Sequence, residues 1–180
     1  ESDFAYGAYG DWRSGETYKW CSESESKLTP DQVAKRKASE EALKKQQEED
    51  HAAAAMECRK VWESAKPAPA DFPYLAKKGV PAHDLRIHAG HLIIPMRDNM
   101  GDIQSLQRIW PDGFKAHWPG GDPKSHYYTI PGRPREFYLC EGFATGASIH
   151  AATGGTVIVA FQAGNLMAVA ANVKKKYPSV

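Results

Sequence analysis

The dipeptide Glu141-Gly142 carries the clearest chemistry, because it lies between a run typical of a strand and a run typical of a helix. Residues 137–140 are β-prone, residues 144–152 are small helix formers, and residues 156–161 form a second apolar run. A β-α-β order predicts parallel strands, and α/β proteins bind ligands at the carboxyl ends of such strands. Glu141 is therefore a candidate catalytic or metal-binding carboxylate. The alternative is a charge that serves only the following helix.

Two further residue types suit a ligand site at the same predicted edge. Gly142 has no side chain, so a bulky partner can approach its backbone. Asn165 follows the second predicted strand, after Gly164, and precedes a helix predicted over 166–176. We expect the loop of Gly164 and Asn165 to lie beside Glu141, where Asn165 either contacts a phosphate or caps the helix.

Four basic residues in the middle of the sequence are candidates for phosphate or DNA binding: Arg97, Arg108, Lys115 and Lys124. Guanidinium and ammonium groups suit phosphate oxygens. The alternative is a solvated strand face on which these cations pair with nearby aspartates. Asp98 and Asp102 are also conceivable metal ligands, but their sequence, IPMRDNMGD, favours a hairpin turn.

The histidines and cysteines do not form a recognisable metal motif. No histidine pair has a helical zinc-site spacing, so structural roles are favoured for His83, His88, His91, His117, His126 and His150. The three cysteines are odd in number and widely spaced, which predicts reduced thiols.

Four segments are predicted to position these residues, in an α+β fold. Residues 1–26 predict an aromatic β hairpin with a turn at Ser14-Gly15, and residues 27–66 predict a long charged helix that begins with a Thr29–Gln32 capping box. Residues 67–135 predict an antiparallel meander with turns at Asn99-Met100-Gly101 and Pro111-Asp112-Gly113. Residues 136–180 predict the parallel unit. Two parallel strands are too few to be stable alone, so the meander or another polypeptide should complete their sheet.

Composition places the chain among ordinary globular proteins. It has 180 residues, of which 42% are hydrophobic and 25% charged, with a net charge of +1. The first 26 residues are acidic and residues 67–135 are mildly basic. No apolar run is long enough to span a bilayer and no leader-like segment is evident, so we expect a cytoplasmic protein without a membrane partner.

Longer motifs resemble a known family. The segment FYLCEGFATGASIHAATGGTVIVAF, followed by QAGNL, resembles the start of the Toprim domain in DNA primases of phages and mobile plasmids. The preceding segment, GVPAHDLRIHAGHLIIPMRDNMGDIQSLQRIWPDGFKAHWPGG, resembles the region before Toprim in the same proteins. The resemblance is strongest from about Tyr74 to Leu166. It implies an antiparallel meander followed by a partial Toprim unit.

The resemblance implies a DNA primase core segment, a nucleotidyltransferase that makes RNA primers on single-stranded DNA. It identifies Glu141 as the metal-site glutamate and Gly142 as its partner, and it places the basic meander residues beside the nucleotide and template. Expected partners are a single-stranded DNA template, ribonucleoside triphosphates and a replicative helicase. The expected cofactor is Mg²⁺ or Mn²⁺.

One part of the family pattern is missing from this sequence. A Toprim domain needs an Asp-x-Asp pair after a later strand, whereas Glu141 is the last acidic residue here. We therefore expect an incomplete magnesium site and no primer synthesis by these 180 residues alone. Two alternatives remain: a non-catalytic module that binds single-stranded DNA or a replication partner, and a Toprim nuclease, against which the upstream meander argues.

Overall fold

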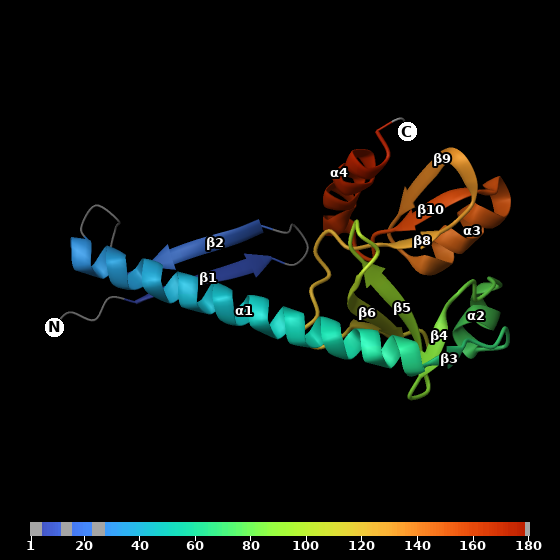
Figure 1. Cartoon of the computed structure of the whole chain (residues 1–180), viewed down its shortest axis with the longest axis horizontal. Helices are drawn as coiled ribbons and strands as arrows, with labels where there is room; N and C mark the ends of the chain where they lie inside the picture. The colour runs from blue at the N-terminus through green and yellow to red at the C-terminus, as the bar shows by residue number, and fades with distance from the viewer. Residues whose placement is uncertain (1–4, 12–15, 23–27, 179–180) are drawn as a thin grey trace. The chain divides into compact units, whose positions relative to one another are not determined.

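A computed structural model describes residues 5–11, 16–22 and 28–178 (Figure 1). The chain divides into two compact units, residues 1–49 and 50–180, which are described here one at a time. Antiparallel sheets, a long helix and one parallel strand pair confirm the predicted α+β class. Among the described residues, no helix is both long and apolar enough to cross a membrane.

The first unit contains the predicted aromatic hairpin. Strands β1 (Tyr6–Asp11) and β2 (Glu16–Cys21) pair antiparallel, with Tyr9 opposite Tyr18. The two tyrosine rings stack with centroids 5.3 Å apart. The hairpin is confirmed, and its predicted Ser14-Gly15 turn lies outside the described residues.

Helix α1 (Pro30–Ser64) begins and ends close to the predicted positions. The Thr29 hydroxyl accepts a hydrogen bond from the Gln32 amide, and the Gln32 side chain accepts one from the Thr29 amide, which is the predicted capping box. In the second unit the end of α1 buries Cys58 and Trp62. The C-terminal end of the helix is therefore packed into the core of the second unit.

The meander is a five-stranded sheet in the order β3-β4-β5-β6-β7, and every neighbouring pair is antiparallel. Helix α2 (Pro73–Lys78) lies between its first two strands in sequence. The tight turns predicted at Gly101 and Gly113 are present, and both glycines have positive φ angles, +94° and +97°. The strands are β3 (Lys66–Pro67), β4 (Arg86–His88), β5 (His91–Arg97), β6 (Ile103–Ile109) and β7 (Lys115–His117).

A second sheet contains the predicted parallel pair. Strand β10 (Gly155–Val159) is the middle strand, parallel to β9 (Arg133–Cys140) and antiparallel to β8 (Tyr128–Ile130). The third strand thus comes from the same chain, immediately after the meander. The predicted domain boundary at 135/136 falls within β9; this and the boundaries at 26/27 and 66/67 stay predictions.

Three helical segments follow the parallel strands: α3 (Phe143–Thr153), the short 3₁₀ helix η2 (Ala163–Asn165) and α4 (Leu166–Lys176). Phe143 and Ala147 of α3 belong to the main core, with residues of both sheets and α2. Val169 and Val173 of α4 pack on Ile158, on the other face of the three-stranded sheet. The layers of the second unit are therefore the end of α1, the meander sheet, the main core, the three-stranded sheet and α4.

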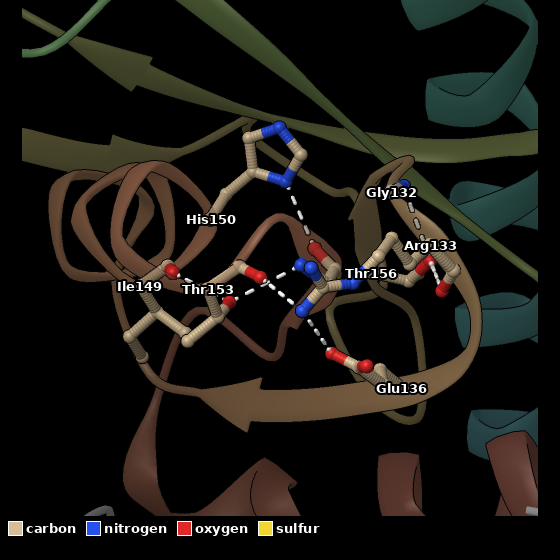
Figure 2. Close-up of polar contacts among 8 residues, drawn as sticks. Gly132, Arg133, Glu136, Ile149, His150, Thr153 and Thr156 are labelled. Carbon is tan, nitrogen blue, oxygen red and sulfur yellow. Dashed lines mark hydrogen bonds and ion pairs between the residues drawn. The ribbon is translucent and has the colours of Figure 1, made fainter.

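A hydrogen-bond network fixes the edge at which β9 and β10 begin (Figure 2). Arg133 donates to the carboxylate of Glu136 at 2.7 Å and to the backbone carbonyl of Thr153 at the end of α3. His150 Nδ1 lies 2.9 Å from the Gly155 carbonyl oxygen. These contacts hold the end of α3 against the starts of both strands.

A candidate nucleotide-binding edge

Glu141 lies where β9 ends and α3 begins, as predicted. The parallel register pairs Cys140 with Val159, so the loops after β9 and β10 leave the sheet at one edge. The Glu141 side chain is exposed, and among the described residues its carboxylate has no hydrogen-bond or ion-pair partner. Gly142 is the N-cap of α3, whose first amides point toward this edge. A free carboxylate thus lies at the positive end of a helix, where an anion is favoured.

Lys115 brings a positive charge to the same place. Its Nζ atom lies 3.9 Å from the position that a Cβ atom would take on Gly142. The ammonium group also lies 5.6 Å from the centroid of the Tyr74 ring. Burial raises the pKa of Tyr74, and the nearby Lys78 and the backbone of Ala144 offset this effect only in part. Tyr74 therefore stays a neutral phenol beside the lysine, and the Lys115 side chain is exposed.

A row of polar side chains continues from Lys115 across the sheet. Lys115 pairs with Ile109 and His117 pairs with Gln107, so these side chains share the face that carries Leu92 and Ile94, which we call the α3 face. Ser105 lies on the same face and is fully buried, and neither its Oγ nor the Nδ1 of His117 has a hydrogen-bond partner among the described residues. Burial lowers the pKa of His117, which favours the neutral imidazole. Unsatisfied buried polar atoms are costly unless a ligand or water pairs with them.

The other predicted arginines lie on the opposite face of the same sheet. Arg108 is adjacent in sequence to Ile109, so its side chain points to the side that carries Ile93 and Leu106, which we call the α1 face. Its guanidinium carbon is 5.3 Å from the centroid of Trp118, which packs in the same cluster as α1. Lys115 and Arg108 therefore lie on opposite faces of the sheet and do not line one groove.

Arg97 also lies toward α1 and is committed to local contacts. It donates to the Gly101 carbonyl at 2.7 Å, and its guanidinium lies 5.9 Å from the Trp62 ring centroid. Burial is the main cause that lowers the pKa of Arg97. Asp98 accepts hydrogen bonds from the Met100 and Asp102 amides, which confirms turn chemistry at this position.

Asn165 lies at the predicted edge, but its side chain neither caps α4 nor points to solvent. The residue is 3% exposed. Its Oδ1 accepts from the Ser125 amide at 2.7 Å, and its Nδ2 donates toward the carbonyls of Pro123, His126 and Ala160 at 3.0–3.1 Å. The cap expectation was therefore wrong, because the chain itself uses all the polar atoms of this side chain. Lys124 is exposed on the loop that Asn165 holds.

The described residues do not complete a metal site. No group of three or more His, Cys, Asp or Glu side chains lies close enough to hold an ion in the part of the chain that the structure describes. Glu141 is one carboxylate, whereas magnesium bound for phosphoryl transfer needs further oxygen ligands. The residues present therefore do not fit a resident ion without additional ligands.

Two features of this edge were missed by sequence reasoning. The contact between Tyr74 and Lys115 depends on the packing of α2, and the shared face of Ser105, Gln107 and His117 depends on strand register. Neither is visible in sequence. The only available signal was the alternation of IQSLQRI, which places Ser105 and Gln107 on the face opposite Arg108. Some of the histidine side chains have structural contacts: His83 packs edge-on against Phe143 and His150, and His126 Nδ1 lies 2.8 Å from the Asp122 carbonyl oxygen.

Comparison with known proteins adds a family relationship. The chain is 30% identical to an Escherichia coli protein named DNA primase TraC over an alignment of 184 positions, which covers 92% of this chain and 17% of the relative. A second Escherichia coli DNA primase TraC matches at 30% identity over 114 residues, 59% of this chain and 8% of the relative. The similarity supports a primase-family relationship.

These relatives are much longer than this chain, which spans less than a fifth of either one. No family model matches the sequence. No solved structure matches it either.

Proposed function

We propose that this chain is the part of a plasmid- or phage-type DNA primase that contains the meander and the first half of a Toprim unit. In this proposal it uses ribonucleoside triphosphates and a single-stranded DNA template. The observation that carries the proposal is the meeting of Glu141, the first turn of α3 and the Lys115 ammonium at one sheet edge. The similarity to the two TraC primases supports the reaction class.

Each group at this edge has a role suited to nucleotidyl transfer. The Lys115 ammonium and the α3 amides bind triphosphate oxygens, because both present positive charge to an anion. Glu141 would supply one ligand of a Mg²⁺ or Mn²⁺ ion, and further oxygen ligands would have to come from other groups. The bound metal would neutralise the triphosphate. Gly142 leaves space for the phosphate, since any side chain there would approach Lys115.

Nucleotide binding by variants tests this assignment. Lys115→Ala should weaken binding of a fluorescent ribonucleoside triphosphate about 10-fold, as expected for loss of a charge-assisted contact. Glu141→Gln should remove the enhancement of that binding by Mg²⁺ while leaving metal-free binding unchanged. Lys60→Ala, which changes an exposed lysine on α1, is the matched control.

Primer synthesis provides the second readout. Residues 1–180 alone should not incorporate labelled ribonucleotides on single-stranded DNA, because Glu141 is the last carboxylate of the sequence. Robust incorporation by these residues would show that the site is complete, contrary to the proposal. Unchanged nucleotide affinity in Lys115→Ala would remove this edge from the function.

A second candidate function is a non-catalytic module that binds single-stranded DNA or a replication partner. The single carboxylate at the edge favours it, since the described residues hold no metal cluster. The two candidates differ in their response to Mg²⁺: nucleotide binding that is absent or independent of the metal supports the non-catalytic module.

A further inference from the structure

The α1 face of the meander sheet carries an exposed group of aromatic rings around Arg108. The guanidinium carbon of Arg108 lies 5.2 Å from the Trp110 ring centroid and 5.3 Å from that of Trp118. Phe114 contacts Trp110 with centroids 5.2 Å apart and is 62% exposed. We call this group, together with two neighbouring imidazoles, the arginine–aromatic surface: His88, His91, Arg108, Trp110, Phe114 and Trp118.

The end of α1 contacts this surface at Trp118 and leaves Trp110 and Phe114 partly exposed. Cys58 and Trp62 of α1 pack on Ile93 and Leu106, further along the strands, and Trp118 is the boundary between the two regions. Trp118 keeps part of its surface exposed, as do Trp110 and both histidines. Rings of this size normally bury most of their area, so their exposure on adjacent strands indicates a binding surface.

Charge and hydrogen bonding indicate the chemistry of the partner. Arg108 donates to the His117 carbonyl at 3.1 Å, but its Nε is buried without a hydrogen-bond partner, and no carboxylate pairs with it among the described residues. The two acids at the rim are already engaged: Glu57 accepts from the Trp118 indole, and Asp112 accepts from the Phe114 amide. A positive charge between exposed rings matches a ligand that alternates anionic groups with flat, apolar rings.

We propose that the arginine–aromatic surface binds unpaired bases of a single-stranded nucleic acid, with Trp110 and Phe114 stacking on bases and Arg108 facing phosphate. Base–aromatic stacking is independent of sequence and is typical of proteins that hold single strands. The surface lies on the sheet face opposite Lys115, so it is separate from the edge that contains Glu141. It would hold the strand away from the reacting groups.

The test compares two fluorescein-labelled strands with equal numbers of phosphates: an oligothymidylate and a strand of abasic sites. Wild-type protein should bind the base-bearing strand about 10-fold more tightly or better, since each lost stack costs about that factor. Trp110→Ala and Phe114→Ala should each reduce this ratio, mainly through weaker binding of oligothymidylate. Trp110→Phe keeps an aromatic ring and should preserve most of the affinity ratio between the two strands.

Controls separate this proposal from the proposed function. Met167→Ala, at an 82% exposed apolar position on α4, should leave the ratio unchanged. Glu141→Gln and Lys115→Ala should also leave it unchanged, whatever their effect on nucleotide binding. Circular dichroism of each variant confirms folding. Equal wild-type affinity for the two strands would overturn the proposal. So would an affinity ratio that is unchanged when Trp110 and Phe114 are both replaced by alanine. A surface that binds a polypeptide instead would give one of these two results.

Discussion

Single side chains decide which parts of the candidate edge are free to bind. Asn165 shows this most clearly, because its position in sequence matched a ligand contact or a helix cap. Its four hydrogen bonds instead tie the loop of Ser125 to the end of β10. Glu141, at the end of the neighbouring strand, makes no such contact in the described part of the chain. The edge therefore combines one fixed amide with one free carboxylate.

His83 should make the folding stability depend on pH. Burial, and then the neighbouring His150, lower the pKa of His83 from its ordinary value of 6.5, and Asp84 opposes the shift only in part. Below about pH 6.5 the unfolded chain therefore takes up a proton that the folded chain resists, so folding stability is lost as the pH falls. His83→Asn should make the free energy of unfolding less dependent on pH between about 5 and 7. Asparagine tolerates the positive φ of +49° at this position.

Urea denaturation at several pH values measures this effect. The wild-type protein should lose more stability than His83→Asn on going from pH 7 to pH 5, and His117, unchanged in both proteins, contributes equally to each. Parallel pH dependences for the two proteins would show that His83 is not protonated differently in the folded and unfolded states.

At the scale of elements, α3 approaches the three-stranded sheet closely at one glycine. A Cβ atom on Gly146 would lie 3.0 Å from a Val159 methyl carbon, 3.1 Å from the Cys140 sulfur and 3.2 Å from a Val157 methyl carbon. All three neighbours are buried, so they have little room to move. The distance between α3 and the strands, and hence the position of Gly142, depends on the absence of this side chain.

Gly146→Ala should destabilise the protein by about 1–3 kcal/mol through overpacking, partly offset by the better helix propensity of alanine, which is worth about 1 kcal/mol. Thermal unfolding followed by circular dichroism measures the difference. Gly164→Ala is the matched control, because nothing lies within 4 Å of its Cβ position. A more stable Gly146→Ala variant would show that helix α3 can shift outward at little cost.

Element types were largely predictable from sequence, and element faces were not. The capping box at Thr29, the glycine turns and the apolar run of 156–161 each depend on local patterns, and each is confirmed. The separation of Arg108 from Lys115 depends on the pairing of Ile109 with Lys115. A shift of one residue in that register would bring Arg108 and Lys115 to the same face of the sheet, and nothing local in the sequence sets the register.

At the scale of the whole second unit, one strand links the meander region to the parallel unit. Strand β8 follows the loop after β7 and pairs with β10, and Tyr127 before it bridges to Arg97 at the end of β5. Sequence analysis left open whether the meander or another polypeptide completes the sheet. The answer depends on contacts between residues far apart in sequence, which periodicity does not reveal.

The central place of β10 has a consequence for the order of folding. Both of its neighbours, β8 and β9, precede it in the chain, so neither has its partner in the sheet until residues 155–159 have been synthesised. During translation, β8 and β9 are therefore made before the strand that pairs with both of them. A chain that stops at residue 153 should show rapid amide hydrogen exchange throughout both strands, and the full chain should acquire protection in both at the same moment. Protection of either strand in the shortened chain would mean that it folds without β10.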